Sequence, residues 1–160
     1  MKDLLAAIKD AMRGEMDSIN IYKHALANTN DEEVKAFFEN RVKEEKEHYN
    51  YLVDHYSSLT NDKALKKIEF TEGENLIFSE NFKRRIGESQ ILFSAISVAT
   101  MLEKNAFEFY GRAAEKTKDI QMKEFFNKMA TWEKQHYDDL LEIAEESEQY
   151  YWQQNRFEPF

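Results

Sequence analysis

The strongest constraint on the fold is an internal repeat with an offset of 88 residues. Residues 7–52 align without a gap to residues 95–140, and the alignment contains sixteen identical pairs in 46 positions. Ordinary composition would give roughly three identical pairs. The repeat therefore indicates a duplicated unit, and its pattern is that of a helical hairpin. Two such hairpins make a four-helix bundle, in which each hairpin covers the apolar face of the other.

Helices account for nearly the whole chain in our prediction. The sequence contains one proline and four glycines, so long stretches carry no helix breaker. Apolar residues recur at a period close to 3.6 in four segments. We expect these helices to cover residues 2–27, 31–56, 89–116 and 119–147. The predicted fold class is all-α.

Residues 57–88 interrupt the helical pattern. A segment of this length without a long helix suits a crossover connection along the bundle, which makes the second and third long helices parallel. A short helix within residues 63–68 is expected on this path, and a linker between two domains is the alternative. We assign residues 1–147 to one bundle domain and residues 148–160 to a C-terminal tail rich in aromatic residues.

Two Glu-x-x-His pairs occupy equivalent positions of the repeat, and on a helix the members of each pair are neighbours on one face. Two further glutamates, also equivalent, lie within or beside an apolar stripe, where a carboxylate is costly to bury unless it is neutralised. The chain has no cysteine, so any metal must bind oxygen and imidazole ligands. The alternative is that the side chains are purely structural. The six residues are Glu15, Glu45, His48, Glu103, Glu133 and His136.

Other aromatic and imidazole side chains are candidates for roles around the site or in the core. Tyr22 and Tyr110 each follow a candidate glutamate by seven residues, which is two turns along the same face. Their hydroxyls are candidates to hydrogen-bond carboxylates around the metal or to pass electrons, and simple packing is the alternative. We interpret Trp132 and the tail aromatics as core or interface residues. His24 and His55 have no partner at ligand spacing, so we expect them on the surface.

Charge and hydropathy exclude several classes of partner. The formal charge of −9 argues against nucleic acid, which requires a basic face. Residues 1–20 carry charges throughout, so no signal peptide is evident. No window approaches the roughly 18 uninterrupted apolar residues of a membrane span. We therefore expect a cytoplasmic protein that binds neither nucleic acid nor membrane.

The second half of the chain carries motifs of a known family. It resembles the short rubrerythrin-like branch of the ferritin-like di-iron carboxylate proteins. The motifs are Met101–Glu103, Glu108–Tyr110, Ala113–Thr117 and Glu133–His136. The resemblance covers all four long helices but not the middle segment or the tail. It implies a ferritin-like bundle with a buried pair of iron ions, in which two helices each give one Glu and the other two each give Glu-x-x-His.

Carried over position by position, the resemblance implies the metal ligands Glu15, Glu45, His48, Glu103, Glu133 and His136. The four glutamates would also be the catalytic residues, with Tyr22 and Tyr110 beside the cofactor. Four carboxylates balance the charge of two Fe²⁺ ions. Manganese is an alternative, because it accepts the same ligands. Neither haem nor flavin is evident.

The function implied by the resemblance is reduction of hydrogen peroxide by a non-haem di-iron oxidoreductase. Full-length rubrerythrins carry a rubredoxin module with Cys-x-x-Cys pairs, and cysteine is absent here. We therefore expect electrons from a separate donor such as a rubredoxin-like protein, and we expect a homodimer. Rubrerythrins also offer a further Glu one turn after the ligand at Glu103, whereas this chain has Ala106.

Two other functions stay open. The set of four glutamates and two histidines is similar to the ferroxidase centre of bacterioferritin, which implies iron oxidation and storage in a closed cage. The other reading is a non-catalytic structural or interaction bundle that metal only stabilises.

Overall fold

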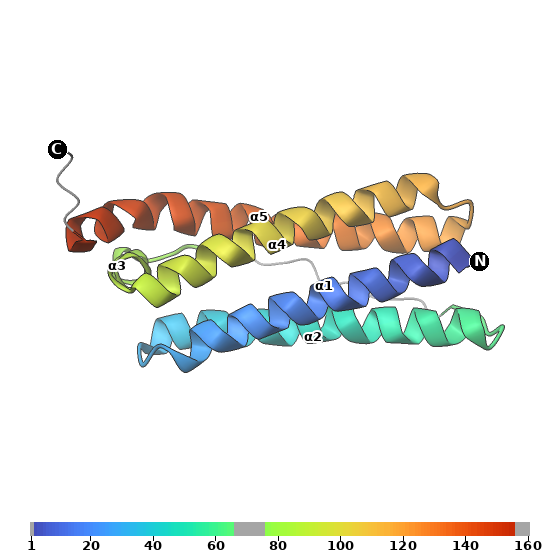
Figure 1. Cartoon of the computed structure of the whole chain (residues 1–160), viewed down its shortest axis with the longest axis horizontal. Coiled ribbons are helices and arrows are strands. Elements are labelled where there is room, and N and C mark those ends of the chain that lie inside the picture. Colours follow the sequence, from blue (N-terminus) through green and yellow to red (C-terminus); the bar gives the residue numbers. More distant parts are fainter. Residues whose placement is uncertain (1, 66–75, 156–160) are drawn as a thin grey trace.

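The computed structural model describes residues 2–65 and 76–155, which form five α-helices and no β-strand. The helices are α1 (Lys2–Ala27), α2 (Glu32–Thr60), α3 (Glu80–Glu88), α4 (Gln90–Lys116) and α5 (Ile120–Asn155). Four of them are long and lie side by side (Figure 1). None of these five helices combines the length and the apolar character that a transmembrane segment requires. The predicted all-α fold is confirmed.

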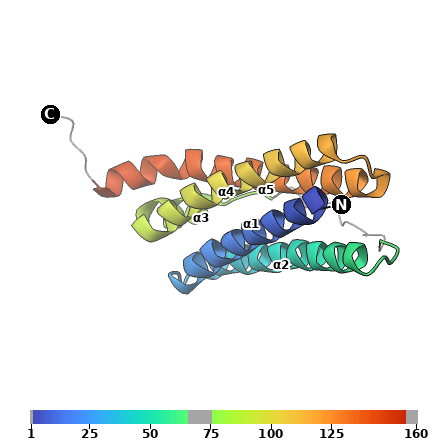
Figure 2. The same cartoon turned by 45° about the vertical axis from the view of Figure 1, so that its right-hand side comes forward.

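The bundle consists of two antiparallel hairpins, α1 with α2 and α4 with α5 (Figures 1 and 2). These hairpins are the two units of the sequence repeat. Contacts between α1 and α4 join them. The arrangement is the ferritin-like four-helix bundle that the sequence predicts.

Equivalent aspartates begin the second helix of each hairpin. The Asp31 carboxylate accepts a hydrogen bond from the backbone N–H of Val34 at 3.1 Å. The Asp119 carboxylate accepts one from the N–H of Met122 at 2.9 Å. Such a cap stabilises a helix by about 1 kcal/mol. The duplication has thus kept the residues that fix the hairpin turn as well as those that line the core.

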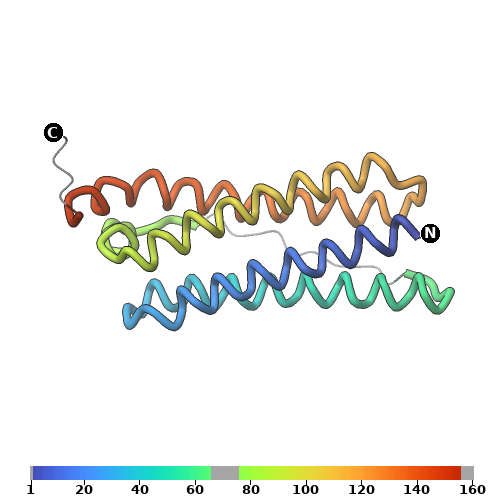
Figure 3. Tube along the Cα trace, in the orientation of Figure 1, coloured from blue at the N-terminus to red at the C-terminus, as the bar shows by residue number. Residues whose placement is uncertain are grey.

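The connection between the hairpins starts and finishes at opposite ends of the bundle. α2 ends near the chain's N-terminus, whereas α3 lies at the opposite end (Figure 3). As a result, α2 and α4 run in the same direction, as the predicted crossover requires. Of the short helix expected within residues 63–68, residues 63–65 are not helical and the others lie outside the described residues.

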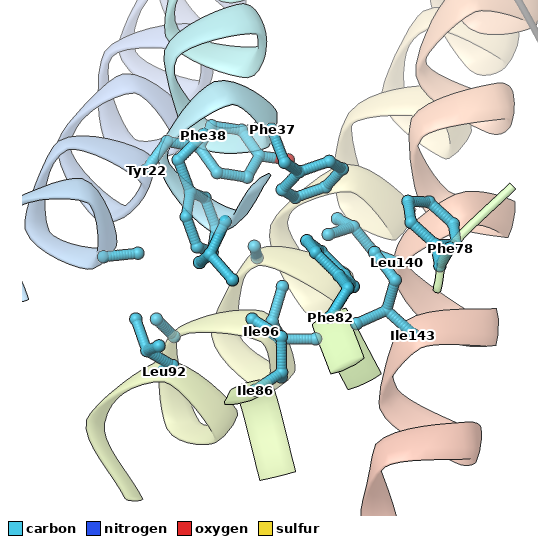
Figure 4. Packing of buried hydrophobic residues seen from close by; sticks show 14 of the residues in the cluster. Tyr22, Phe37, Phe38, Phe78, Phe82, Ile86, Leu92, Ile96, Leu140 and Ile143 are labelled. Carbon is cyan, nitrogen blue, oxygen red and sulfur yellow. The ribbon is translucent and has the colours of Figure 1, made fainter. Parts of the chain in front are cut away.

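α3 is a helix that the sequence analysis did not predict. Ser79 caps it, because the Ser79 hydroxyl accepts a hydrogen bond from the N–H of Phe82 at 3.0 Å. Phe82 and Ile86 are four residues apart, lie on one face of the helix and are buried (Figure 4). So short an apolar pattern does not separate helix from loop in the sequence alone.

Two helices are longer than predicted. Their predicted last residues are 56 and 147, whereas α2 continues to Thr60 and α5 to Asn155. Neither extension contains glycine or proline, so nothing in the local sequence stops the helix. The division of the chain into domains at residue 147 stays a prediction.

Aromatic residues of the predicted tail anchor the end of α5. The Tyr150 hydroxyl donates a hydrogen bond to the Glu80 carboxylate at 2.6 Å. The Tyr151 ring stacks on Phe93 with their centroids 4.5 Å apart. These contacts join α5 to α3 and α4. Residues 156–160 of the predicted tail lie outside the described residues.

The apolar core is divided into two clusters, one toward each end of the bundle. The first includes Phe38 and Phe82 and lies where α3 packs on the long helices (Figure 4). The second includes Leu52 and Phe126 and lies toward the other end. Full burial of each large apolar side chain stabilises the fold by about 1.5–3 kcal/mol. The clusters can therefore support a polar layer between them.

α3 packs closely against α5 at Gly87. A Cβ at this position would lie 2.6 Å from the Cβ of Tyr150 and closer still to the backbone oxygen of Ser147. Both distances are shorter than van der Waals contact. Any side chain at Gly87 would therefore push the two helices apart.

We expect Gly87→Ala to lower the free energy of unfolding by about 1–3 kcal/mol, as overpacking does in other interiors. Gly111→Ala is the matched control, because a Cβ there meets nothing within 4 Å. Alanine inside a helix is favoured over glycine by about 0.5–1 kcal/mol, so the control should be slightly stabilised. Urea unfolding measures both values, and equal stability of the two variants would contradict the close packing of α3 on α5.

Candidate metal centre

The six candidate ligands predicted from the sequence come together in the layer between the two apolar clusters. α1 supplies Glu15 and α4 supplies Glu103, whereas α2 and α5 each supply one Glu-x-x-His pair. All six residues are buried, with at most 3 % of their surface exposed. Burial of several carboxylates in one layer is costly without a compensating positive charge.

The six side chains form two overlapping groups of four. In each group, one donor atom from every side chain lies within 4.8 Å of the others. The groups are Glu15, Glu45, His48, Glu133 and Glu45, Glu103, Glu133, His136. Glu45 and Glu133 belong to both groups, so their carboxylates lie between the two positions. The cluster is therefore compatible with a di-iron site.

Donor atoms at the centre are close together without being hydrogen-bonded. His48 Nδ1 lies 2.6 Å from Glu133 Oε1, and His136 Nδ1 lies 2.8 Å from Glu45 Oε1. None of these four atoms has a hydrogen-bond partner in the part of the chain that the structure describes. Ligands at about 2.1 Å from an octahedral cation are about 3 Å apart. The donor set thus suits cations between the atoms better than hydrogen bonds among them.

Two buried tyrosines link the repeats at this layer. Tyr22 Oη donates a hydrogen bond to Glu103 Oε1 at 2.5 Å, and Tyr110 Oη donates one to Glu15 Oε1. Hydrogen bonds to carboxylates, one of the alternatives considered for these tyrosines, are thus present, and their acceptors are candidate ligands themselves. A role of the tyrosines beside a bound metal stays a prediction. Electron transfer through the tyrosines stays a prediction.

Each tyrosine bonds the glutamate of the other repeat, although the glutamate of its own helix lies two turns away. Helical side chains lean toward the N-terminus of their own helix. α1 and α4 run in opposite directions (Figure 1), so Tyr22 leans toward the centre while Glu103 leans toward Tyr22. The same relation brings Tyr110 to Glu15.

Beyond the cluster, the surroundings of the two imidazoles differ. His136 Nε2 lies 3.1 Å from Glu44 Oε2. Arg41 donates hydrogen bonds to Glu44 at 3.0 Å and to Asp139 at 2.5 Å. The His48 ring instead contacts Trp132, with ring centroids 4.2 Å apart.

Glu44 and Asp139 were not predicted from the sequence as part of the site, and Arg41 was assigned no role. A signal for Arg41 was available, because it is a charged residue within the apolar stripe of its helix. Trp132 is buried, as predicted for a core residue.

Burial and neighbouring charges set the protonation of the cluster. Burial, with added repulsion from neighbouring carboxylates, raises the pKa values of Glu15 and Glu103 well above the usual range. Burial also acts to raise the pKa values of Glu45 and Glu133, but the neighbouring imidazolium charges outweigh it. The pKa of Glu45 is therefore well below its usual value, and that of Glu133 is lowered to about 2.

The histidines show the opposite balance. Burial acts to lower the pKa values of His48 and His136, but the adjacent carboxylates raise them well above the usual value. Without a bound cation, the ionised form is thus favoured for Glu45, Glu133 and the two histidines, whereas Glu15 and Glu103 keep their protons to higher pH than ordinary carboxyl groups. Cations must displace these protons to bind.

A groove of about 390 Å³ between α1 and α4 leads toward the cluster. Its inner wall contains Glu15 and Tyr110, and small residues such as Gly14 and Ala106 leave it open. The other predicted ligands do not line it. A small molecule could therefore approach the cluster beside Glu15.

The histidines outside the centre follow the prediction only in part. His24 is exposed, as expected. The surface prediction is wrong for His55, which is 3 % exposed. Its Nδ1 lies 2.8 Å from the carbonyl oxygen of Tyr51, and its ring stacks on Phe125. The aromatic neighbour comes from the other hairpin, so the sequence around His55 could not show it.

We expect the apparent affinity for a divalent cation to fall as pH is lowered. The groups with raised pKa values take up more protons at lower pH, and each must release its proton on binding. Isothermal titration calorimetry with Mn²⁺ in buffers of different ionisation enthalpy counts the released protons. Glu15→Gln should release fewer, and an affinity independent of pH would contradict the proton competition.

We expect Glu45→Ala or Glu133→Ala to abolish binding of one or both metal ions, because each carboxylate belongs to both groups. Metal analysis after reconstitution with iron is the measurement. Glu47→Ala is the matched control, since it removes a carboxylate that belongs to neither group from the same helix. Unchanged metal content in both test variants would refute the assignment.

Comparisons with known proteins agree with this geometry. The family model described as Rubrerythrin matches residues 6–144. Among solved structures, the chain is similar to a hypothetical protein from Pyrococcus furiosus, with 25% sequence identity, a TM-score of 0.68 and 92% of each chain covered. No curated protein matches. The extent of the family match, over all four long helices, shows that the chain belongs to the rubrerythrin family.

Proposed function

We propose that this protein is a di-iron oxidoreductase that reduces hydrogen peroxide with electrons from a separate redox protein. The observation that carries the proposal is the groove between α1 and α4, which reaches Glu15 and Tyr110 beside a buried cluster of metal-binding side chains. The family membership of the chain supports the same reaction class.

Two iron ions would occupy the two overlapping groups. His48 would belong to one ion, His136 to the other, and the carboxylates of Glu45 and Glu133 to both. Four ionised carboxylates carry the charge that two divalent cations neutralise. The unpartnered oxygen and nitrogen atoms of the cluster supply the required donors.

When bound, two ferrous ions supply the two electrons that convert one hydrogen peroxide and two protons to two waters. The chain's own contribution is to position the reactants and the protons. Tyr110 Oη holds the Glu15 carboxylate in place at the inner end of the groove. Burial first, and then the Glu15 charge, raise the pKa of Tyr110 well above its usual value. Tyr110 therefore keeps its hydroxyl proton and positions Glu15 as a hydrogen-bond donor.

The charge of the groove suits a neutral substrate. Apart from Glu15, whose raised pKa favours the neutral form when no cation is bound, the lining contains two aspartates and two arginines, so their formal charges cancel. Asp10 and Arg13 form an ion pair at 2.9 Å. A lining without net charge does not concentrate cations, whereas an iron-storage protein has to collect Fe²⁺. Hydrogen peroxide is small and uncharged, so it suits both the size of the groove and the charge of its lining.

The electron donor is proposed to be a separate protein such as a rubredoxin-like one. These 160 residues contain no cysteine and cannot themselves hold an iron–thiolate site. The homodimer and the cytoplasmic location stay predictions.

Iron oxidation and storage is the second candidate, and Ala106 is the observation that favours it. Ala106 lies in the wall of the groove, one turn after Glu103, where the rubrerythrins that the sequence resembles offer a further glutamate. A methyl group cannot take part in an exchange of ligands. A fixed set of four glutamates and two histidines resembles a ferroxidase centre in this respect.

Stopped-flow oxidation of the anaerobic iron-loaded protein by hydrogen peroxide and by O₂ tests the choice. We expect peroxide to react faster and to oxidise two ferrous ions per molecule. Gly14→Leu should slow this reaction, because Gly14 lines the groove, and Gly111→Leu is the control outside it. Faster oxidation by O₂ together with a large cage in light scattering would instead support storage. Absence of oxidation by either would leave a structural bundle.

A further inference from the structure

We propose that the two metal positions are unequal, and that Glu44 makes the position served by His136 the tighter one by holding that imidazole in place. This inference rests on the two-metal centre proposed above. Glu44 acts through His136, so it is a positioning residue.

The inequality originates in a difference between the repeats. Glu44 and Trp132 occupy equivalent positions, 88 residues apart, and each directly precedes a glutamate shared by both metal positions. Each side chain crosses to the histidine of the other hairpin. The duplicated helices therefore place an equivalent residue beside each of the two imidazoles. In one repeat this residue is a charged carboxylate, and in the other it is an aromatic ring.

The residue beside the outer nitrogen of His136 is the charged Glu44, and other charged residues hold it in place. The Glu44 carboxylate lies 3.1 Å from His136 Nε2, the ring nitrogen that faces away from the cluster. Arg41 is buried and fixes Glu44 from one side, while Asp139 fixes Arg41 from the other. A buried charged network of this kind is costly to assemble unless every partner is engaged. In this protein the network runs from Asp139 through Arg41 to Glu44, and Glu44 contacts the His136 imidazole.

Behind His48 the corresponding contact is aromatic. The Trp132 and His48 rings lie edge to face, at an interplanar angle of 65°. In residues 2–65 and 76–155, the carboxylate contacts of His48 are all made by Nδ1, on the side of the cluster. The carboxylate contact at Nε2 that distinguishes His136 has no counterpart among them. On this side the His48 imidazole is therefore supported by the aromatic contact.

A carboxylate behind a metal-bound imidazole orients the ring and makes it a stronger donor. Loss of such an outer partner typically lowers metal affinity by about 10- to 100-fold. The His136 position has this support and the His48 position lacks it. The two ions should accordingly bind in two steps rather than as an equivalent pair.

Titration of the metal-free 160-residue chain with Co²⁺, followed by visible absorption, tests the proposal. We expect two binding steps whose affinities differ by about 10- to 100-fold. Glu44→Leu should weaken the tighter step by about 10-fold or more and leave the weaker one unchanged. Glu44→Gln keeps an oxygen acceptor and should restore part of the loss, which a purely structural role would not produce.

Two controls isolate the effect of Glu44. Glu39→Leu removes an exposed carboxylate from the same helix and should change neither step. Trp132→Phe keeps an aromatic ring against His48 and should likewise leave the tighter step intact. Thermal unfolding by circular dichroism confirms that each variant is folded at the titration temperature.

Variants of the histidines identify the positions. His136→Gln should remove the tighter step, and His48→Gln should retain it. The reverse order, or two equal steps in the unaltered protein, would overturn the inequality while leaving the two-metal centre in place. Equal weakening of both steps in Glu44→Leu would overturn the role of Glu44. Binding of fewer than two Co²⁺ ions per chain would overturn the centre itself.

Discussion

Neutralising four buried carboxylates in one layer is the constraint on which the rest of this structure depends. Their charge would be prohibitive in an apolar bundle. When no cation is bound, the raised pKa values of His48 and Glu15 favour the protonated forms, which reduce this negative charge. Cations at the two overlapping groups would balance it instead. The apolar clusters on either side stabilise the bundle enough to hold such a layer. Metal binding and folding are therefore linked in this protein through the charge of its core.

The duplication explains why the layer has two equivalent positions. A hairpin delivers one glutamate from its first helix and a Glu-x-x-His pair from its second. Two antiparallel copies bring these donors to a common level. The lean of helical side chains then makes the tyrosine of one copy bond the glutamate of the other. Each hairpin thus completes the site of its partner, which binds the two copies together.

Residues that differ between the two repeats give the centre properties that two identical repeats could not provide. Glu44 and Trp132 differ at equivalent positions and give the two imidazoles different surroundings. Small residues line a groove between α1 and α4, and this groove reaches Glu15 and Tyr110 of the centre. Both departures lie outside the cluster while its donors stay duplicated. Two metal positions with duplicated donors can therefore share a single groove and still have histidines in different surroundings.

The sequence by itself determined the hairpins, the crossover and the six side chains that meet at the centre. Helical period, Glu-x-x-His spacing and the 88-residue repeat are local or internal properties that need no knowledge of packing. Only the tertiary structure decided the tyrosine pairing across repeats, the burial of His55, the docking of α3 at Gly87 and the outer partners of the imidazoles. Each of these depends on side chains from distant segments, and their contact is settled by how the helices cross.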